Sequence, residues 1–292
     1  MVKLTNILVF LFLMLMITSC EEDFVLERNH YEPKIVINSL FKPGENWSVH
    51  ISKSRDLLAK DSDDTPIDNA KVYITEKKTS QQIRLQHVGN GIYTSTTFPP
   101  LPDRTYEIVV DVEGFKTATA SSKAPLNANI VNVISDVVDK EVTKVNFEVK
   151  DNISNYLIWN FISNGSQQID TTHTSNPQKF VQDIVKYNNI SNYLSNLTIS
   201  ENNAITQEGS FTRNFKDNYP EYTDSTTTTV TKKYLRVMTA SQDLYEYFIS
   251  MEKFISAGNH NSSFSYAPSV YSNINNGLGI FAGFTEEYKE IK

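Results

Sequence analysis

The sequence predicts a mainly β protein: an N-terminal Ig-like β-sandwich followed by a second β-rich domain with one amphipathic helix. Three observations support this fold class. Short segments alternate apolar and polar residues, turn residues separate them at close intervals, and only one segment has helical periodicity. The chain is also rich in Tyr, Phe, Thr, Ser and Asn, a composition that favours strands joined by polar turns.

The strand pattern begins near residue 34. "KIVINSLF" ends before the turn pair Pro43 and Gly44. In the next segment Trp47, Val49 and Ile51 alternate with polar residues, as expected for a half-buried strand. Residues 104–114 and 115–122 are predicted to form a hairpin. About seven short strands at this spacing predict an Ig-like sandwich over residues 32–125. The expected strand segments are 34–41, 47–54, 70–78, 89–96, 104–114 and 115–122.

The remaining residues, 126–292, are expected to form the second β-rich domain. Residues 143–151 and 155–163 are predicted to be neighbouring strands of a second sheet, residues 164–203 long loops, and residues 226–239 a further β segment.

One helix is expected near residues 241–257. Ser241 is a suitable N-cap and Asp243 favours the first turn. Apolar residues repeat at helical spacing, which indicates a packing face rather than a ligand site. These residues are Leu244, Tyr247, Phe248, Met251, Phe254 and Ile255.

The N-terminus is typical of a secretory signal. Lys3 precedes an apolar run, residues 7–17, that is too short for a membrane span of roughly 20 residues. Residues 17–20, Ile-Thr-Ser-Cys, resemble a bacterial lipobox. This resemblance implies cleavage after residue 19 and acylation of Cys20, the single cysteine, with fatty acids such as palmitate. An ordinary signal peptide with an incidental cysteine, or an uncleaved anchor, stays an alternative.

An acidic cluster, Glu21, Glu22 and Asp23, follows the cysteine. It resembles the surface-export signal of Bacteroidota lipoproteins and implies exposure on the cell surface. The alternative is a solvated tether. The expected organisation is a signal peptide at residues 1–19, a lipidated tether at 20–31, and then the two domains.

The chain as a whole resembles a Bacteroidota outer-membrane lipoprotein family known as domain of unknown function 4249. The segments that carry the resemblance follow one another in order from Cys20 to the end: residues 34–56, 65–74, 89–95, 105–114 and 268–284. The resemblance implies an N-terminal Ig-like domain, a second β-rich domain, and genes beside TonB-dependent outer-membrane transporters. It implies no catalytic residues.

No motif for chemistry emerges from the residues themselves. The five histidines have no metal-ligand spacing, and no nucleophile-elbow, Walker or dinucleotide motif is present. Asp61, Asp63 and Thr65 match only the opening of a calcium loop, and Pro66 stands where glycine is required, which favours a solvated turn. A net charge of −7 argues against nucleic acid. We expect no metal, no cofactor and no enzymatic activity.

Aromatic residues among Asn and Thr in the second half are candidate partner contacts, because exposed tyrosines among small polar residues are typical of recognition surfaces. The alternative is that they pack loops onto the core. The candidates are Tyr187, Tyr193, Phe211, Phe215, Tyr219 and Tyr222.

We therefore expect a non-enzymatic lipoprotein, anchored to the outer membrane and exposed on the cell surface, that serves as accessory or binding subunit of a TonB-dependent transporter. Three alternatives stay open: a structural or adhesive surface protein, a subunit of an envelope assembly or secretion complex, and a glycan hydrolase, which would need two carboxylates across a cleft.

Overall fold

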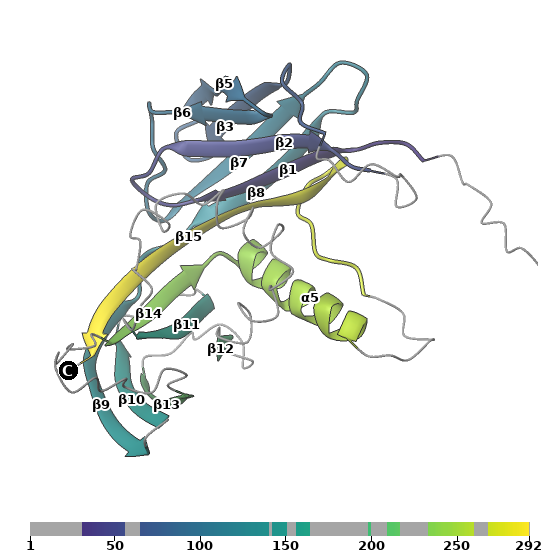
Figure 1. Cartoon of the computed structure of the whole chain (residues 1–292). Helices are drawn as coiled ribbons and strands as arrows, with labels where there is room; N and C mark the ends of the chain where they lie inside the picture. The colour runs from purple at the N-terminus through teal and green to yellow at the C-terminus, as the bar shows by residue number, and fades with distance from the viewer. Residues whose placement is uncertain are drawn as a thin grey trace, which may run out of the picture. The chain divides into compact units, whose positions relative to one another are not determined.

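The computed structural model describes residues 31–55, 65–139, 142–150, 156–163, 198–199, 209–216, 233–259 and 268–291. By its contacts the chain divides into Met1–Glu32 and one compact unit, Pro33–Lys292. In the described part strands dominate and one helix is present, so the predicted mainly β class, with an Ig-like sandwich and a second β-rich region, is confirmed (Figure 1).

The N-terminal sandwich has two layers of antiparallel strands. One layer has the order β1-β2-β6-β5 and the other β4-β3-β7-β8. The expected hairpin is present as β7 paired with β8. The strands are β1 (Ile35–Phe41), β2 (Trp47–Lys53), β3 (Lys71–Glu76), β4 (Gln82–Arg84), β5 (Gln86–Gly89), β6 (Ile92–Ser95), β7 (Arg104–Asp111) and β8 (Ala118–Ala124).

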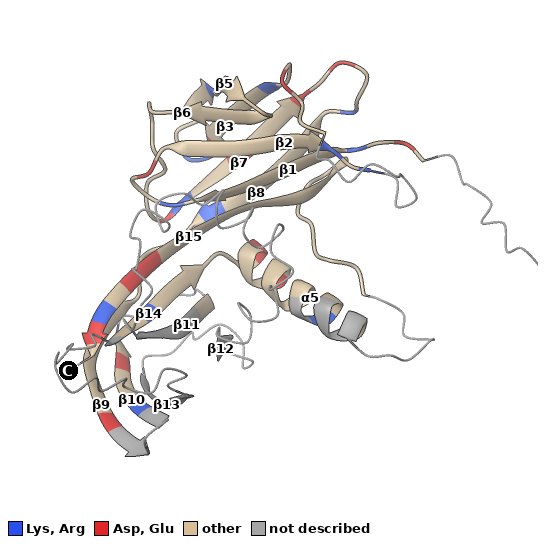
Figure 2. Cartoon of the chain, viewed as in Figure 1, with Lys and Arg blue, Asp and Glu red and all other residues tan. Residues whose placement is uncertain are grey.

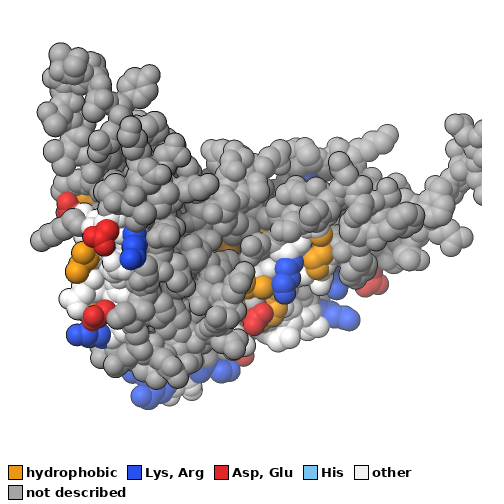
Figure 3. All heavy atoms as spheres, turned by 90° about the horizontal axis from the view of Figure 1, so that it is seen from below, with side chains coloured by type: hydrophobic (Ala, Val, Ile, Leu, Met, Phe, Trp, Pro, Cys, Tyr) orange, Lys and Arg blue, Asp and Glu red, His pale blue; other side chains and the backbone are white. Residues whose placement is uncertain are grey.

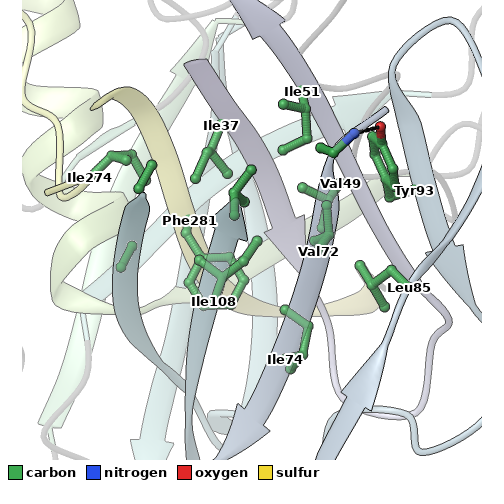
Figure 4. Packing of buried hydrophobic residues seen from close by; sticks show 14 of the residues in the cluster. Ile37, Val49, Ile51, Val72, Ile74, Leu85, Tyr93, Ile108, Ile274 and Phe281 are labelled. Atoms are coloured by element: carbon green, nitrogen blue, oxygen red, sulfur yellow. Dashed lines mark hydrogen bonds between the residues drawn. The ribbon is translucent and has the colours of Figure 1, made fainter. Parts of the chain in front are cut away.

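The core of this sandwich lies between the two layers. The predicted alternation of β2 is confirmed, because Trp47, Val49 and Ile51 are all buried. Tyr93 is buried as well, and its hydroxyl accepts a hydrogen bond from the Ala70 N–H at 2.8 Å (Figure 4). This bond satisfies a backbone donor that would otherwise be buried without a partner.

The second region adds a three-stranded sheet, β13-β10-β9, and further strands in the order β12-β11-β14-β15. Its elements are β9 (Asn129–Asp139), β10 (Val142–Lys150), β11 (Tyr156–Ser163), β12 (Thr198–Ile199), β13 (Gly209–Lys216), β14 (Lys233–Ala240), α5 (Gln242–Asn259) and β15 (Gly277–Ile291).

The prediction that residues 143–151 and 155–163 are neighbouring strands is wrong. Strand β10 pairs with β9 and β13, whereas β11 pairs with β12 and β14. Side chains of the two strands meet instead in one core, where Phe147 and Leu157 are both buried. An alternating apolar pattern reports which face of a strand is buried, but it does not report whether the neighbour lies beside the strand or across the core.

The predicted helix is present as α5. The Leu244 N–H donates to Ser241 Oγ at 3.4 Å, so Ser241 caps the helix as expected. Leu244, Tyr247 and Phe248 are buried against β14 and β15. Phe254 differs from the expectation, because its side chain is 44% exposed. Met251, one turn before Phe254, still packs against the core of α5, β14 and β15, so the described apolar contacts of the helix lie mainly in its first three turns. Figure 1 shows the helix running away from the sheet toward its C-terminal end.

The expected boundary between the two domains lies between residues 125 and 126, and one sheet contains strands from both sides of it. Strand β15, from the end of the chain, pairs in parallel with β1 through residues 277–283 and antiparallel with β14 through residues 284–291. Eight of the described strands thus form one continuous sheet, β12-β11-β14-β15-β1-β2-β6-β5. The sequence did not predict this pairing, because hydrogen bonding between distant strands has no local sequence signal.

Glu76 gives one prediction about acid stability. Its carboxylate accepts hydrogen bonds from the Thr79 hydroxyl and from the backbone N–H groups of Lys78 and Thr79 in the turn after β3. The Thr79 hydroxyl contributes most to lowering the pKa of Glu76 below its usual 4.5. A lowered folded-state pKa contributes stability above pH 4.5 that is lost as the pH falls through the folded pKa.

We therefore expect Glu76→Gln to be less stable than the wild type at pH 7, with the difference shrinking below pH 4.5. Urea unfolding midpoints of both proteins at pH 7 and pH 3 measure this. Glu113→Gln, at an exposed position, is the control. An equal difference at both pH values would contradict the assignment.

Candidate functional site

Most residues that the sequence predicts as functional lie outside the described residues. This applies to the lipidation and export positions Cys20, Glu21, Glu22 and Asp23, to the aromatic candidates Tyr187, Tyr193, Tyr219 and Tyr222, and to the acidic loop at 61–64. Phe211 and Phe215 are described. They lie on strand β13, opposite Phe147 and Thr143 of β10, and not in loops as expected. The residues between Phe211 and Phe215 are polar, so the sequence did not indicate that this segment forms a strand.

A buried ion pair lies on β14 and β15. Arg236 donates through Nη2 to Glu286 Oε1, and the Tyr288 hydroxyl donates to Glu286 Oε2 at 3.2 Å. The side chains of Arg236 and Glu286 are only 9% and 3% exposed. Figure 2 shows the further acidic and basic residues along this end of β15. Buried charges require a partner, and here each side chain supplies the opposite charge for the other.

A second polar cluster joins the sandwich to the start of α5. The Ser122 hydroxyl on β8 donates to Asp243 Oδ2 at 2.6 Å and lies 3.2 Å from Ser241 Oγ. The Tyr271 hydroxyl donates to Asp243 Oδ1 at 3.1 Å. Burial, with the neighbouring Asp243 carboxylate, raises the pKa of Tyr271 to about 12. Tyr271 therefore keeps its proton at physiological pH and stays a hydrogen-bond donor.

A third cluster lies at the surface of the sandwich. Asp68 Oδ1 accepts a hydrogen bond from the Gly91 N–H at 2.7 Å and lies 2.9 Å from His87 Nε2. The Gly91 N–H contributes most to holding the pKa of Asp68 below its usual value. This contact ties the 65–70 loop to the turn between β5 and β6.

Each of these three clusters joins separate elements of the chain. In the cluster at Ser122, the hydroxyl and the Asp243 carboxylate form a hydrogen bond that joins β8 to the first turn of α5. Within the described ranges no group of three or more His, Cys, Asp and Glu side chains is arranged to hold a metal ion. Nor does a helix there combine the length and apolarity needed to cross a membrane.

The surface seen from below carries mixed charges. Among the described side chains visible in Figure 3, acidic, basic and hydrophobic groups lie interspersed. Exposed apolar side chains also occur at separate places in the sequence, including Val88 on β5, Leu101 after β6 and Ile134 on β9. Single exposed apolar residues are normal on a soluble surface.

The sequence did not identify Arg236, Glu286, Ser122 or Tyr271 as members of these clusters. It identified Asp243 as a residue of the first helical turn, but not as a contact of the sandwich. One signal was available for the ion pair: Arg236 is the only charge in the run "YLRVM", residues 234–238. A single charge within a strand that is apolar on both faces indicates a buried, paired residue. The contacts of Ser122 and Tyr271 have no comparable signal in the sequence.

Comparison with known proteins gives one family and one set of structures. The family model described as domain of unknown function (DUF4249) matches residues 21–290. No curated protein matches. Among solved structures, the chain is similar to the FN1–FN3 domains of chicken CNTN1, with 10% identity and a TM-score of 0.29. That match covers 71% of this chain, which spans 60% of the CNTN1 chain.

The family match extends over nearly the whole chain after Cys20 and includes α5 and every described strand, except for the last residue of β15, Ile291. It agrees with the resemblance seen in the sequence, in which the matching segments run from the acidic cluster to the last strand. The chain belongs to the DUF4249 family, the domain of unknown function that its residues 21–290 match.

Proposed function

We propose that the protein is a non-enzymatic lipoprotein, held on the outer membrane by acyl chains on Cys20 and exposed on the cell surface. There it serves as a binding subunit of a TonB-dependent transporter system. The observation that carries the anchoring is that the family match begins at residue 21, directly after a cysteine preceded by Ile-Thr-Ser. The part shared with the family is the part that would follow lipid attachment and cleavage.

The arrangement of the folded body supports this proposal. The compact unit begins at Pro33, so twelve residues separate it from Cys20. A segment of that length spans at most about 40 Å when extended. Several acyl chains on one residue provide a firm anchor, since each buried methylene contributes about 0.8 kcal/mol. The fold would then stand outside the lipid and present its β surfaces to a partner.

The partner contact is proposed for the second β-rich region. Phe211 and Phe215 lie on β13, which ends one side of the described three-stranded sheet. An end strand presents backbone N–H and C=O groups to which a further chain could pair. With the other four aromatic candidates, Tyr187, Tyr193, Tyr219 and Tyr222, this region would supply apolar area together with backbone hydrogen bonds.

Cys20→Ala is expected to abolish membrane attachment, because the side chain that receives the acyl chain is lost. Fractionation of cells and incorporation of labelled palmitate measure the effect. The control is the triple variant Glu21→Ala, Glu22→Ala and Asp23→Ala, which should stay lipidated but lose accessibility to protease added to intact cells. Cys20→Ala protein that stays in the membrane fraction and takes up palmitate would refute the anchor.

The partner is tested by purifying the tagged protein from native outer membrane in mild detergent and identifying what accompanies it by mass spectrometry. A transporter in stoichiometric amount, absent from the Cys20→Ala preparation, supports the proposal. A clean preparation without a partner favours the structural or adhesive alternative. Components of an assembly or secretion complex in place of a transporter favour that function.

A further inference from the structure

We propose that residues 277–283 of β15, the closing segment, make closure of the N-terminal sandwich depend on the C-terminal end of the chain. As a consequence, the sandwich and the second β-rich region fold and unfold as one cooperative unit. The closing segment pairs with β1 from residue 35 to residue 41, and the same strand then continues into its pairing with β14. One uninterrupted strand thus belongs to both regions.

The closing segment contributes a central side chain to the sandwich core. Phe281 is fully buried, and its ring lies 4.8 Å from the Phe41 ring and 6.3 Å from Trp47, measured between centroids. Figure 4 shows Phe281 among side chains from the sandwich strands. Without the closing segment, β1 would lack a neighbour on one side and these rings would lose a large apolar contact.

The closing segment also approaches the other layer of the sandwich. A Cβ atom at Gly283 would lie 2.3 Å from the Lys123 carbonyl oxygen of β8 and 2.9 Å from Ala124 Cα. The backbones of β15 and β8 are therefore too close for a side chain at this position. The strand fits between β1 and β8, where it closes the gap between the layers on this side.

Three asparagines before the closing segment fasten it in place. The Asn273 side chain both donates to the Phe281 carbonyl, at 2.8 Å, and accepts from the Phe281 N–H, at 3.0 Å. The Asn275 backbone exchanges two hydrogen bonds with Thr119 of β8. Asn276 Nδ2 donates to the Thr117 carbonyl at 3.2 Å. The asparagines of "SNINNG", residues 272–277, therefore hold this run by hydrogen bonds to the closing segment and to the sandwich.

This arrangement has a consequence for the order of folding. The sandwich core is incomplete until the last strand of the chain is available. For a chain exported from its N-terminus, as proposed above, the first strands would cross the membrane before the closing segment and could not complete the sandwich alone. The coupling itself does not depend on export and is tested on the purified protein.

Native-state hydrogen exchange of the full-length protein, resolved by peptide, tests the coupling. We expect Phe281→Ala to accelerate exchange of the slowest amides in β1 and β2 by about 100-fold, because a buried Phe→Ala change costs several kcal/mol and each 1.4 kcal/mol is a factor of ten. The slowest amides of β11 and β14 should accelerate by the same factor, although they lie in the other region.

Leu278→Ala is the matched control on the same strand, because that side chain is 41% exposed, and it should leave exchange in both regions within about twofold of wild type. Phe281→Leu replaces Phe281→Ala should the latter not fold, with a smaller but again equal acceleration in both regions. Faster exchange in β1 and β2 with unchanged exchange in β11 and β14 would overturn the proposal, since the two regions would then unfold separately.

Discussion

Gly279→Ala is expected to lower the free energy of unfolding by about 4 kcal/mol. Gly279 has φ +99°, which only glycine adopts without strain, and a Cβ atom there would lie 2.2 Å from the Ile37 carbonyl oxygen. Strain contributes about 1–3 kcal/mol and the collision with the β1 backbone about the same.

Gly114→Ala separates these two contributions. Gly114 also has a positive φ, +84°, but a Cβ atom there would meet nothing within 4 Å. We expect a loss of only about 1 kcal/mol for this variant. Urea or guanidinium unfolding of both variants and the wild type measures the difference. Equal losses at the two positions would contradict the close approach of β15 to β1.

Arg236→Ala is expected to destabilise the protein by about 3–5 kcal/mol, because it leaves the Glu286 carboxylate buried without its cation. The Tyr288 hydroxyl alone, at 3.2 Å, does not compensate a buried charge. Denaturant unfolding at neutral pH measures the loss. The exposed pair Lys77 and Glu107, whose side chains are 48% and 36% exposed, gives the comparison: Lys77→Ala should cost less than about 1 kcal/mol.

Replacing both Arg236 and Glu286 tests whether the loss of stability comes from leaving a buried charge without its partner. The double variant Arg236→Met with Glu286→Leu removes both charges and fills the site with apolar groups. We expect its stability to lie within about 1 kcal/mol of the wild type, because burying an ion pair costs roughly what the pair returns. An Arg236→Ala loss no larger than that of Lys77→Ala would mean that Glu286 is hydrated.

The local elements of this fold follow from its sequence. Alternation of Trp47, Val49 and Ile51 predicts both the strand and its buried face, since successive side chains point to opposite faces. Leu244, Tyr247 and Phe248 at helical spacing, after the cap Ser241, predict α5 in the same way. Such patterns depend only on neighbours in the chain, and they were sufficient for the fold class. The family was indicated separately, by the resemblance of several segments that follow one another in order.

The candidate functional residues were harder to predict from the sequence than the local elements of the fold. The proposed lipidation position and the proposed export signal depend on short linear motifs, which a sequence displays directly. The buried ion pair of Arg236 and Glu286 joins two strands 50 residues apart, and only the lone charge in an apolar run pointed to it. The contact between Ser122 and Asp243 joins common polar residues whose types give no indication of a partner.

The sequence by itself predicted most strands of the sandwich, the helix and many of the faces that are buried, but not the strands β9 and β13. It also indicated Cys20 as the residue that would carry the anchor. Only the tertiary structure decided which strands are neighbours. The glycines of "GLGIFAG" do not report which strands lie beside them, and only the structure shows that these strands are β1 and β8. The physical reason is that strands pair through backbone N–H and C=O groups, which are the same at every residue, so the partner of β15 is selected by the packing of the whole core.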